Sequence, residues 1–373
     1  MLHILMVGYE KEALTLTAPA FLRIQAYTDE KIVIHTLILS GGIAQDTRVQ
    51  TDRMEAYGFR GNALRRMTRA LWTGFQLVRR FRGSILISAQ DPFLAGLLAY
   101  KLHLVTNAPY EVQEHGDFFT PAWEMLSIKN RLMTVLGKIV LSRANRIRVV
   151  SERVKEHLLA LGNAEKKIYT LPVSQELTTL RAIPLRQRDP QSPFQFVIPC
   201  RWTYQKGLDL AIEACRLLKE KTNASFTLTL IGRGELENSL KEAVRTAGLE
   251  AHINFLSWLP SEELWNNADA LLVPSRWEGW CRTIPEAMAA GVSVITTPVG
   301  CVGSFFRADI DGVCIAPEQP QTLCDAMEAL INDPEGRERM RQAARARTLT
   351  LATPSELREQ QRREWRASFQ ALL

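Results

Sequence analysis

Short apolar runs alternate with longer segments of helical periodicity along almost the whole chain. In the first half, the runs that predict strands are residues 3–8, 32–39, 84–89, 110–115 and 146–151. In the second half, they are residues 194–200, 226–232, 253–257, 270–275 and 292–297. Helical patterns fill most of the intervals, and this alternation is typical of parallel βαβ units. We therefore predict an α/β protein in which two doubly wound, Rossmann-like domains face each other across a cleft.

The domain boundary is predicted by one polar segment. Residues 186–193 read RQRDPQSP, contain two prolines and show no periodicity, as expected of a linker. We predict an N-terminal domain over residues 1–185 and a C-terminal domain over residues 194–350. Residues 353–373 predict a terminal helix that packs back on the N-terminal domain, because one face carries Leu357, Trp365, Phe369 and Leu372.

Charge and cysteine content narrow the class of protein. The 46 Lys and Arg residues outnumber the 40 Asp and Glu residues, which gives a formal net charge of +6. This excess suits an anionic partner such as a nucleotide phosphate, an anionic lipid or a nucleic acid. The six cysteines form no Cys-x-x-Cys pair, so we expect reduced thiols, a cytoplasmic location and no metal site. No apolar run approaches the roughly 18 residues of a membrane-spanning helix.

Two loops of the C-terminal half carry candidate binding residues. Ligands of parallel α/β domains bind at the carboxyl ends of the strands. Arg201 and Lys206 fall in the loop after the strand at 194–200, and this placement suits a diphosphate next to a helix N-terminus. Gly232 and Gly234 form a Gly-x-Gly turn, but Glu237 occupies the third glycine position of a dinucleotide fingerprint. The turn is therefore expected to line the same crevice without binding a nicotinamide cofactor.

The segment EGWCRTIPEAMAAG, residues 278–291, permits two interpretations. Thr283 and Glu286 fit a Thr-x-x-Glu capping box, with Pro285 in the first helical turn. Glu286 would then only close the start of a helix, and Glu278 would be a solvated loop residue. Alternatively, the two carboxylates flank a binding site. The segment by itself does not choose between these interpretations.

Four motifs together resemble a known family. RWTYQKG, LIGRGELENSLKEAV, the stretch from INFLS to PVG, and DGVCIAP follow the order and spacing of the C-terminal domain of group-1 glycosyltransferases. These are retaining enzymes of glycosyltransferase family 4 with the GT-B fold. The resemblance is close over residues 195–335, and EVQEHGDFF is more loosely similar to the strand and His-Gly loop of the family's N-terminal domain.

The resemblance implies an activity. It implies metal-independent transfer of a sugar from a UDP-sugar or GDP-sugar to the hydroxyl of a sugar, oligosaccharide or lipid-linked acceptor. The setting would be the synthesis of cell-surface polysaccharide or glycolipid, and no cofactor is expected. Two alternatives stay open: a non-catalytic partner subunit of the same fold, and a nucleotide-sugar epimerase. A nucleic-acid-binding protein is disfavoured, because the arginines lie on predicted helices without interleaved stacking aromatics.

The resemblance also assigns roles to individual residues. Glu278 would bind hydroxyls of the donor sugar and Glu286 the ribose, while His115 would lie near the donor sugar and the acceptor hydroxyl. Side-chain cations would neutralise the leaving diphosphate as the glycosidic bond breaks. The catalytic residues would be Glu278 and His115, and the donor-binding residues would be Arg201, Lys206, Gly232, Trp280, Cys281, Arg282, Thr283 and Glu286.

The sequence departs from the family pattern in three places. The loop VGYEKEALTL has one glycine where the family has a glycine-rich loop, so no residue role is assigned there. Cys281 stands where a Gly or Pro is usual, and its small size predicts that the turn is kept. PVGCVGSFF lacks the common second glycine and the following Pro-Glu pair, which indicates an unusual donor pocket.

One N-terminal segment suggests where the protein works. Residues 62–82 predict a surface helix with one face formed by Leu64, Met67, Leu71, Phe75 and Val78. The other face carries Arg65, Arg66, Arg69, Arg79 and Arg80, with Trp72 at the boundary. Such an arginine face can meet anionic headgroups at up to ~1 kcal/mol per residue. We therefore predict peripheral association with the inner face of the membrane.

Overall fold

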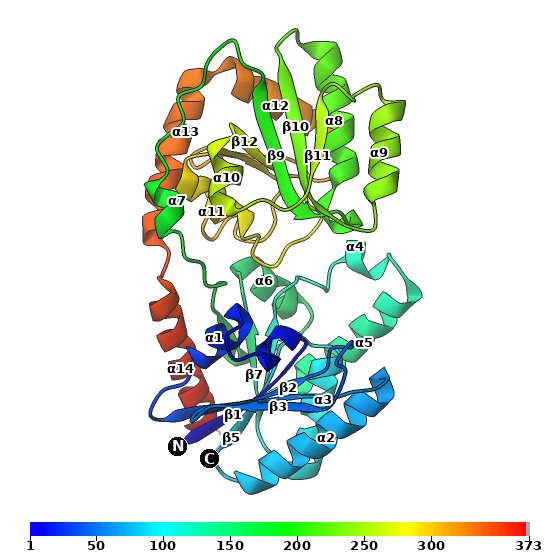
Figure 1. Ribbon diagram of the computed structural model, residues 1–373, viewed down its shortest axis with the longest axis vertical. Coiled ribbons are helices and arrows are strands. Elements are labelled where there is room, and N and C mark those ends of the chain that lie inside the picture. The colour runs from blue at the N-terminus through cyan, green and yellow to red at the C-terminus, as the bar shows by residue number, and fades with distance from the viewer. Residues whose placement is uncertain (371–373) are drawn as a thin grey trace. The chain divides into compact units, whose positions relative to one another are not determined.

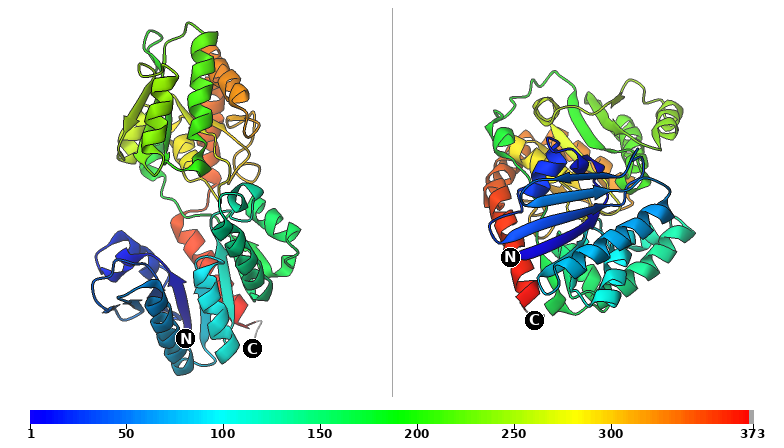
Figure 2. Two further views of the ribbon diagram at one scale, coloured as in Figure 1. Left: turned by 90° about the vertical axis from the view of Figure 1, so that its right-hand side faces the viewer. Right: turned by 60° about the horizontal axis from the view of Figure 1, so that its bottom comes forward.

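A computed structural model describes residues 1–370, and these form two compact units (Figures 1 and 2). The first unit comprises Met1–Pro172 and helix α14 (Pro354–Gln370), and the second comprises Val173–Thr353. Residues 173–185 therefore belong with the second unit and not, as expected, with the first. The reason is local packing: Leu177 and Leu180 are buried, and Arg181 donates a hydrogen bond to the carbonyl oxygen of Thr348 at 2.7 Å.

The first unit is built on an eight-stranded sheet with the order β3-β4-β2-β1-β5-β6-β7-β8. All neighbouring strands are parallel except β3 and β4, which are antiparallel. The strands are β1 Leu2–Gly8, β2 Ile32–Ile38, β3 Thr47–Gln50, β4 Met54–Gly58, β5 Ile85–Ala89, β6 Tyr110–Glu114, β7 Arg146–Val149 and β8 Ile168–Thr170. The helices before α14 are η1 Lys11–Leu14, α1 Pro19–Gln25, α2 Ala63–Arg80, α3 Leu94–Thr106, α4 Pro121–Glu124, α5 Ile128–Arg143, α6 Glu152–Ala160 and η2 Glu165–Lys167.

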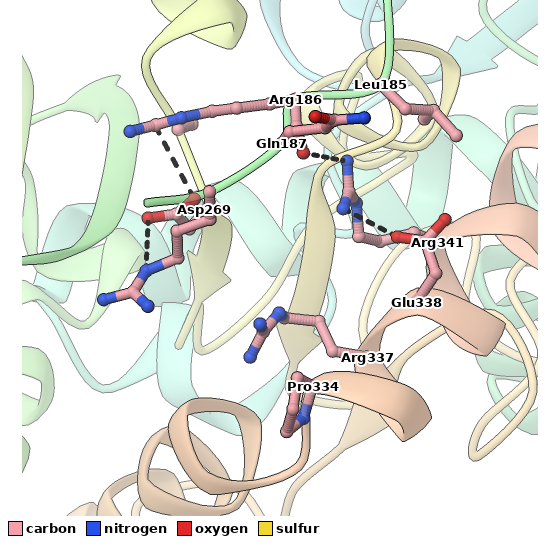
Figure 3. A pocket seen from close by; sticks show the side chains of 10 residues that line it. Leu185, Arg186, Gln187, Asp269, Pro334, Arg337, Glu338 and Arg341 are labelled. Atoms are coloured by element: carbon pink, nitrogen blue, oxygen red, sulfur yellow. Dashed lines mark hydrogen bonds and ion pairs between the residues drawn. The ribbon is translucent and has the colours of Figure 1, made fainter. Parts of the chain in front are cut away.

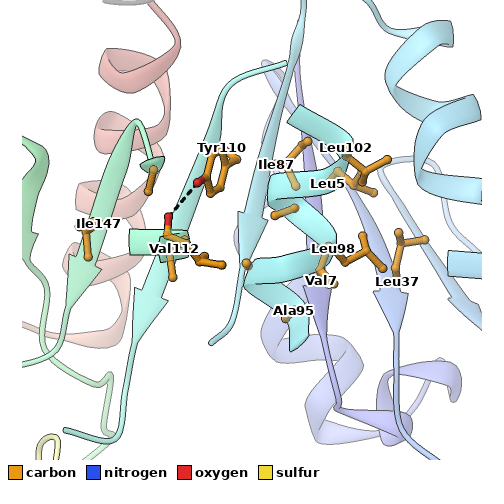
Figure 4. Close-up of a cluster of buried hydrophobic side chains, with 14 of the residues drawn as sticks. Leu5, Val7, Leu37, Ile87, Ala95, Leu98, Leu102, Tyr110, Val112 and Ile147 are labelled. Atoms are coloured by element: carbon orange, nitrogen blue, oxygen red, sulfur yellow. Dashed lines mark hydrogen bonds between the residues drawn. The ribbon is translucent and has the colours of Figure 1, made fainter. Parts of the chain in front are cut away.

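Both faces of this sheet are buried, because side chains alternate along each strand. On β1, Leu5 and Val7 point into one apolar cluster, and Ile4 and Met6 into another. Figure 4 shows Leu5 and Val7 beside the residues of α3 in the first cluster. The second cluster contains Trp365 of α14. This two-sided burial explains the continuous apolar runs and confirms the predicted doubly wound arrangement.

Helix α14 is attached to the first sheet by polar contacts as well as by Trp365. Gln361 Nε2 donates to the hydroxyl of Tyr169 at 2.8 Å, and that hydroxyl donates to Glu111 Oε2 at 2.7 Å. Trp365 Nε1 donates to the other oxygen of Glu111 at 3.3 Å. Of the predicted apolar face, Leu357 and Trp365 are buried and Phe369 packs on the core. Leu372 lies outside the described residues.

The second unit contains a fully parallel six-stranded sheet with the order β11-β10-β9-β12-β13-β14. The strands are β9 Phe194–Arg201, β10 Phe226–Arg233, β11 Ile253–Leu256, β12 Ala270–Val273, β13 Ser293–Thr296 and β14 Val313–Cys314. The helices are α7 Thr178–Ala182, η3 Tyr204–Lys206, α8 Leu208–Lys221, α9 Glu237–Thr246, α10 Ser261–Asn266, α11 Thr283–Ala290, α12 Pro320–Asn332, α13 Pro334–Arg347 and η4 Thr348–Thr350. Helices α8, α9 and α12 share one apolar cluster with the sheet, while α11 and α13 contact strand β13.

Candidate active site

The loop between β9 and α8 is shaped by Gly207. This residue is the N-cap of α8 and has a φ of 63°, in the left-handed region that favours glycine. A Cβ at this position would collide with the carbonyl oxygen of Pro274, in the loop that follows β12. The close approach of these two backbones brings the preceding residue, Lys206, toward the β12 loop.

Lys206 and Glu278 form an ion pair at the carboxyl edge of the sheet. The Nζ–Oε1 distance is 2.5 Å, and both side chains are largely buried. Ser275 Oγ donates to the same carboxylate oxygen at 2.9 Å. Burial lowers the pKa of Lys206, but the adjoining Glu278 carboxylate more than offsets this, so the pKa lies above its ordinary value. The ammonium group therefore stays charged at neutral pH, and Glu278 is not a solvated loop residue.

The predicted capping box at Thr283 is wrong. Helix α11 begins at Thr283 itself, its N-cap is Arg282 in a helical conformation, and no side chain caps the helix. Glu286 therefore lies one residue beyond the position that a capping box requires. Its side chain is free for another role.

The approach to α11 presents unpaired backbone donors. Cys281 has a φ of 64°, which is unusual for a residue with a Cβ. Within residues 1–370, the backbone N–H groups of Trp280, Cys281 and Arg282 donate no hydrogen bond to protein. They lie directly before a helix N-terminus, where N–H groups and the helix dipole favour an anion. These are three of the residues to which the resemblance assigns donor binding.

Gln175, which sequence analysis did not identify, connects the residues around α11. Its side-chain oxygen accepts a hydrogen bond from Trp280 Nε1 at 3.1 Å. Its nitrogen donates to Glu286 Oε1 at 3.2 Å and to the carbonyl oxygen of Arg282 at 2.9 Å. Burial raises the pKa of Glu286, and Arg282 Nη2, 3.6 Å from Oε1, opposes this rise. Gln175 lies in the segment that the sequence had assigned to the other domain.

Two further predicted residues lie at the ends of neighbouring strands. Arg201 is the last residue of β9, is exposed, and takes part in no ion pair among the described residues. Gly232, on β10, has a φ of 143°, and a Cβ there would collide with the carbonyl oxygen of Cys200. The guanidinium of Arg201 is thus available to an anion at this edge of the sheet. Gly232 has no side chain, so its backbone can approach that of Cys200 closely.

Arg276, which sequence analysis also did not identify, connects the β9–α8 loop to the β12–α11 loop. Its guanidinium lies 3.8 Å from the centre of the Tyr204 ring and donates to the carbonyl oxygen of that residue at 2.7 Å. It also pairs with Asp209 of α8 and with Glu318, at 2.7 Å each. Arg276 therefore fixes the β9–α8 loop relative to the β12–α11 loop.

His115 belongs to the first unit and follows strand β6. Its Nε2 lies 3.0 Å from Gln113 Oε1, which also accepts a hydrogen bond from Arg148 Nη1 at 3.0 Å. An amide oxygen is an acceptor only, so Nε2 carries the proton and Nδ1 is left as an acceptor. Burial lowers the pKa of His115 to about 3, and Arg148 adds to this effect. The imidazole is therefore neutral at physiological pH.

The neighbouring carboxyl group of Glu114 was not singled out in the sequence. It is fully buried and accepts hydrogen bonds from the backbone N–H groups of Gly116, at 3.1 Å, and Phe118, at 3.3 Å. Burial raises its pKa to about 8 despite these donors. Glu114 shapes the loop that presents His115.

The family models and known proteins to which this chain is similar are glycosyltransferases. Residues 185–347 match the family model of the group 1 glycosyl transferases, and residues 32–174 match a glycosyl transferase 4-like domain. WcaL from Escherichia coli (strain K12), provisionally named a colanic acid biosynthesis glycosyltransferase, is 26% identical over 277 residues, covering 68% of this chain and 63% of WcaL. The amylovoran biosynthesis glycosyltransferase AmsK from Erwinia amylovora is 31% identical over 185 residues, covering 47% and 44% respectively. The matches thus span less than two thirds of these relatives' own lengths.

A solved structure shares the fold over nearly the whole chain. The HepE protein of Anabaena, in complex with UDP-glucose, superposes with a TM-score of 0.73 at 16% identity, covering 99% of this chain and all of HepE. At this identity the likeness concerns the fold alone. The two family models follow one another in the expected order and together account for most of the sequence. Residues 185–347 thus form a domain of the group-1 glycosyltransferases, and residues 32–174 form a glycosyl transferase 4-like domain.

Proposed function

We propose that the protein transfers a sugar from a UDP-sugar or GDP-sugar to an acceptor hydroxyl in polysaccharide synthesis. The observation that carries this proposal is the Lys206–Glu278 pair beside three unpaired backbone N–H groups at the start of α11. Lys206 and the N–H groups offer positive potential to a diphosphate. The carboxylate of Glu278 offers hydrogen-bond acceptors to the hydroxyls of a sugar. The WcaL and AmsK names support a polysaccharide product, and the UDP-glucose bound to HepE supports the donor class.

The proposed reaction needs charge stabilisation at the leaving group. As the bond between the anomeric carbon and the diphosphate oxygen breaks, negative charge grows on the phosphates. Arg201, Lys206 and the amide groups before α11 would stabilise that charge in place of a metal ion. Glu278 would hold sugar hydroxyls, and Glu286 would bind the ribose. The acceptor oxygen would attack the same face of the sugar, its proton passing to a phosphate oxygen of the leaving diphosphate, with retained configuration.

The test is the release of nucleoside diphosphate from a panel of UDP-, GDP- and other activated sugars. We expect one donor to be hydrolysed slowly without acceptor, at a rate that EDTA does not change. Lys206→Met should abolish the release, and Lys241→Met, an exposed lysine on α9, should leave it unchanged. Failure of every donor, with no nucleotide binding, would favour the non-catalytic alternative. Interconversion of sugar epimers would favour the epimerase alternative.

We also propose that the protein associates peripherally with anionic membranes. None of the helices within residues 1–370 is long and apolar enough to cross a membrane. The arginine face of α2 is partly occupied by protein contacts: Arg66 donates to the carbonyl oxygen of Leu39 at 3.0 Å, and Arg69 pairs with Asp46. On the opposite face Leu64 is exposed, although Met67, Leu71 and Phe75 pack on the core as expected.

Helix α5 offers a better surface for this association. Ile128, Leu132, Val135 and Ile139 recur at helical spacing and are each 49–77% exposed. The helix contains no acidic residue, and four cations flank the exposed apolar stripe: Lys129, Arg131, Lys138 and Arg143. An apolar stripe between cations is typical of helices that lie in the membrane interface.

Co-sedimentation with vesicles of graded anionic-lipid content, at low and high salt, tests the membrane proposal. Binding should rise with anionic lipid and fall with salt. Changing Ile128, Leu132 and Ile139 together to Gln should abolish binding, and the same change at Arg65, Arg66 and Arg69 of α2 should only weaken it. The reverse ranking would place the association on α2. Wild-type protein that ignores anionic vesicles at low salt would contradict the proposal.

A further inference from the structure

A cavity of about 470 Å³ lies in the second unit at the opposite edge of the sheet from the candidate active site. It is bordered by Asp269, which directly precedes β12, and by the first turns of α13. The active-site loops instead follow the carboxyl ends of β9 and β12. The cavity is therefore a separate feature of the domain.

Four arginines line this cavity, and only two carboxylates accompany them. The arginines are Arg186, Arg188, Arg337 and Arg341, and the carboxylates are Asp269 and Glu338. The lining therefore has a formal net charge of +2. Figure 3 shows Arg186 reaching toward Asp269, and the side chain of Arg337 projecting from α13 on the other side of the cavity. Such an excess of positive charge around one hollow favours an anionic ligand.

The two arginines of the linker are incompletely satisfied by the protein. Arg186 Nη1 is 3.6 Å from Asp269 Oδ1, and Arg188 Nε is 3.7 Å from Oδ2, both too far for hydrogen bonds. Both nitrogens are buried, and neither has a hydrogen-bond acceptor among the described residues. A buried donor without an acceptor destabilises a fold, and native proteins contain few such groups.

Arg337 has a hydrogen-bond acceptor but no ion-pair partner among the described residues. Its guanidinium donates to the carbonyl oxygen of Leu330 and lies over the Phe194 ring, which Arg188 also contacts. No carboxylate within residues 1–370 forms an ion pair with Arg337. Burial lowers its pKa, Asp269 and Asp333 raise it, and repulsion from Arg188 and Arg341 lowers it. A bound anion would relieve this repulsion and accept the free donors.

From these contacts, we infer that the cavity binds a phosphate-bearing small molecule. Planar guanidinium groups pair well with phosphate oxygens, often through two parallel hydrogen bonds. A phosphate dianion would match the net charge of the lining. The cavity exceeds the volume of phosphate alone, so the remainder would hold the group to which the phosphate is attached.

Two of the arginines also hold the linker in place through hydrogen bonds, and a substitution can separate this role from ligand binding. Arg341 donates to the carbonyl oxygens of Arg186, at 3.3 Å, and of Gly291, at 2.6 Å, and Arg188 donates to that of Ser192. Those contacts would hold the linker without any ligand. They do not use the guanidinium of Arg186, which makes Arg186 the cleanest position for a test.

The experiment is calorimetric titration with inorganic phosphate at constant ionic strength, with chloride as the balancing anion. Wild-type protein should bind phosphate, and Arg186→Gln and Arg337→Gln should each weaken binding about tenfold or more. Arg339→Gln is the matched control, because Arg339 lies on the exposed side of α13 and does not line this cavity. Glucose 6-phosphate in a parallel titration should bind more tightly than phosphate; equal affinity would identify free phosphate as the ligand.

A further variant separates this cavity from the active site. Arg201→Gln removes a cation from the candidate diphosphate site and should leave phosphate binding here unchanged. Loss of binding in Arg201→Gln alone, or equal binding by wild type, Arg186→Gln and Arg337→Gln, would overturn the inference. So would a wild-type protein that does not bind phosphate. If Arg186→Gln fails to fold, Arg337→Gln decides by itself.

Discussion

Lys206 Nζ lies 2.5 Å from Glu278 Oε1, although 72 positions separate the two residues in the sequence. Each follows a strand of the central sheet, and these strands, β9 and β12, pair in parallel. The close approach of Gly207 to Pro274 brings the two loops together, and Arg276 holds them there. The pair thus joins the residue proposed to bind phosphate to the one proposed to bind sugar.

Breaking this pair should destabilise the second unit. Lys206→Met leaves the Glu278 carboxylate buried without a cation, and we expect a loss of about 3 kcal/mol in the free energy of unfolding. Glu278→Gln should cost less, because an amide oxygen still accepts a hydrogen bond from Lys206. The double variant should recover part of the loss. Urea unfolding of the three variants measures the coupling, and strictly additive losses would mean that the pair contributes nothing.

Glu286→Gln should weaken nucleotide binding without destabilising the fold. Because Glu286 closes no capping box, we expect a change within about 0.5 kcal/mol in the free energy of unfolding. Loss of the carboxylate contact to the ribose should weaken binding of the nucleoside diphosphate about tenfold. Gln175→Ala, which frees Trp280 and Glu286 together, should have a similar effect on binding. Unchanged affinity in both variants would exclude this side of α11 from the site.

Sequence analysis could identify elements and residues from their position along the chain, but not residues whose roles depend on tertiary contacts. Strand and helix periodicity located the sheets, and Lys206 could be named because it follows a strand. Glu278 and Glu286 could be named only through the resemblance to a family. Sequence analysis missed β3, β4, β8 and β14, which are only two to five residues long and have little periodicity. It also missed Gln175 and Arg276, whose roles depend on partners that tertiary packing supplies. The sequence Thr283-x-x-Glu286 matches the capping-box pattern, but the helix begins at Thr283, so no capping box forms.

Cys281 should tolerate glycine but not valine. Its φ of 64° lies in the left-handed region, which glycine adopts readily. For a residue with a Cβ this conformation costs roughly 1–2 kcal/mol of conformational energy, and it is least favourable for a branched side chain. We expect Cys281→Gly to keep nucleotide binding, since the turn before α11 is preserved. Cys281→Val should distort that turn and lose binding. Thermal unfolding and nucleotide titration of both variants provide the check, and equal behaviour would mean that this conformation is unimportant.

Glu114 should make the stability of the first unit depend on pH. Its pKa rises from 4.5 to about 8 on folding, so the folded state binds more protons than the unfolded state in that range. Its contribution to stability is therefore greatest below pH 4.5 and is lost as the pH rises toward 8. In wild type the free energy of unfolding should fall by up to about 1.4 kcal/mol per pH unit through this effect. In Glu114→Gln this fall should be absent. A constant difference between the two proteins from pH 5 to 8 would contradict the burial effect.

The central claim is that the edge of the second sheet around Lys206 and α11 binds a nucleoside diphosphate. Calorimetric titration of UDP and GDP tests it most directly, with wild type, Arg201→Ala, Lys206→Ala and the exposed-lysine control Lys241→Ala. The account predicts that one of the two nucleotides binds to wild type and to the control. Each active-site variant should lose about 1.5–3 kcal/mol of binding free energy. Binding that is identical in all four proteins, or absent from wild type, would contradict it.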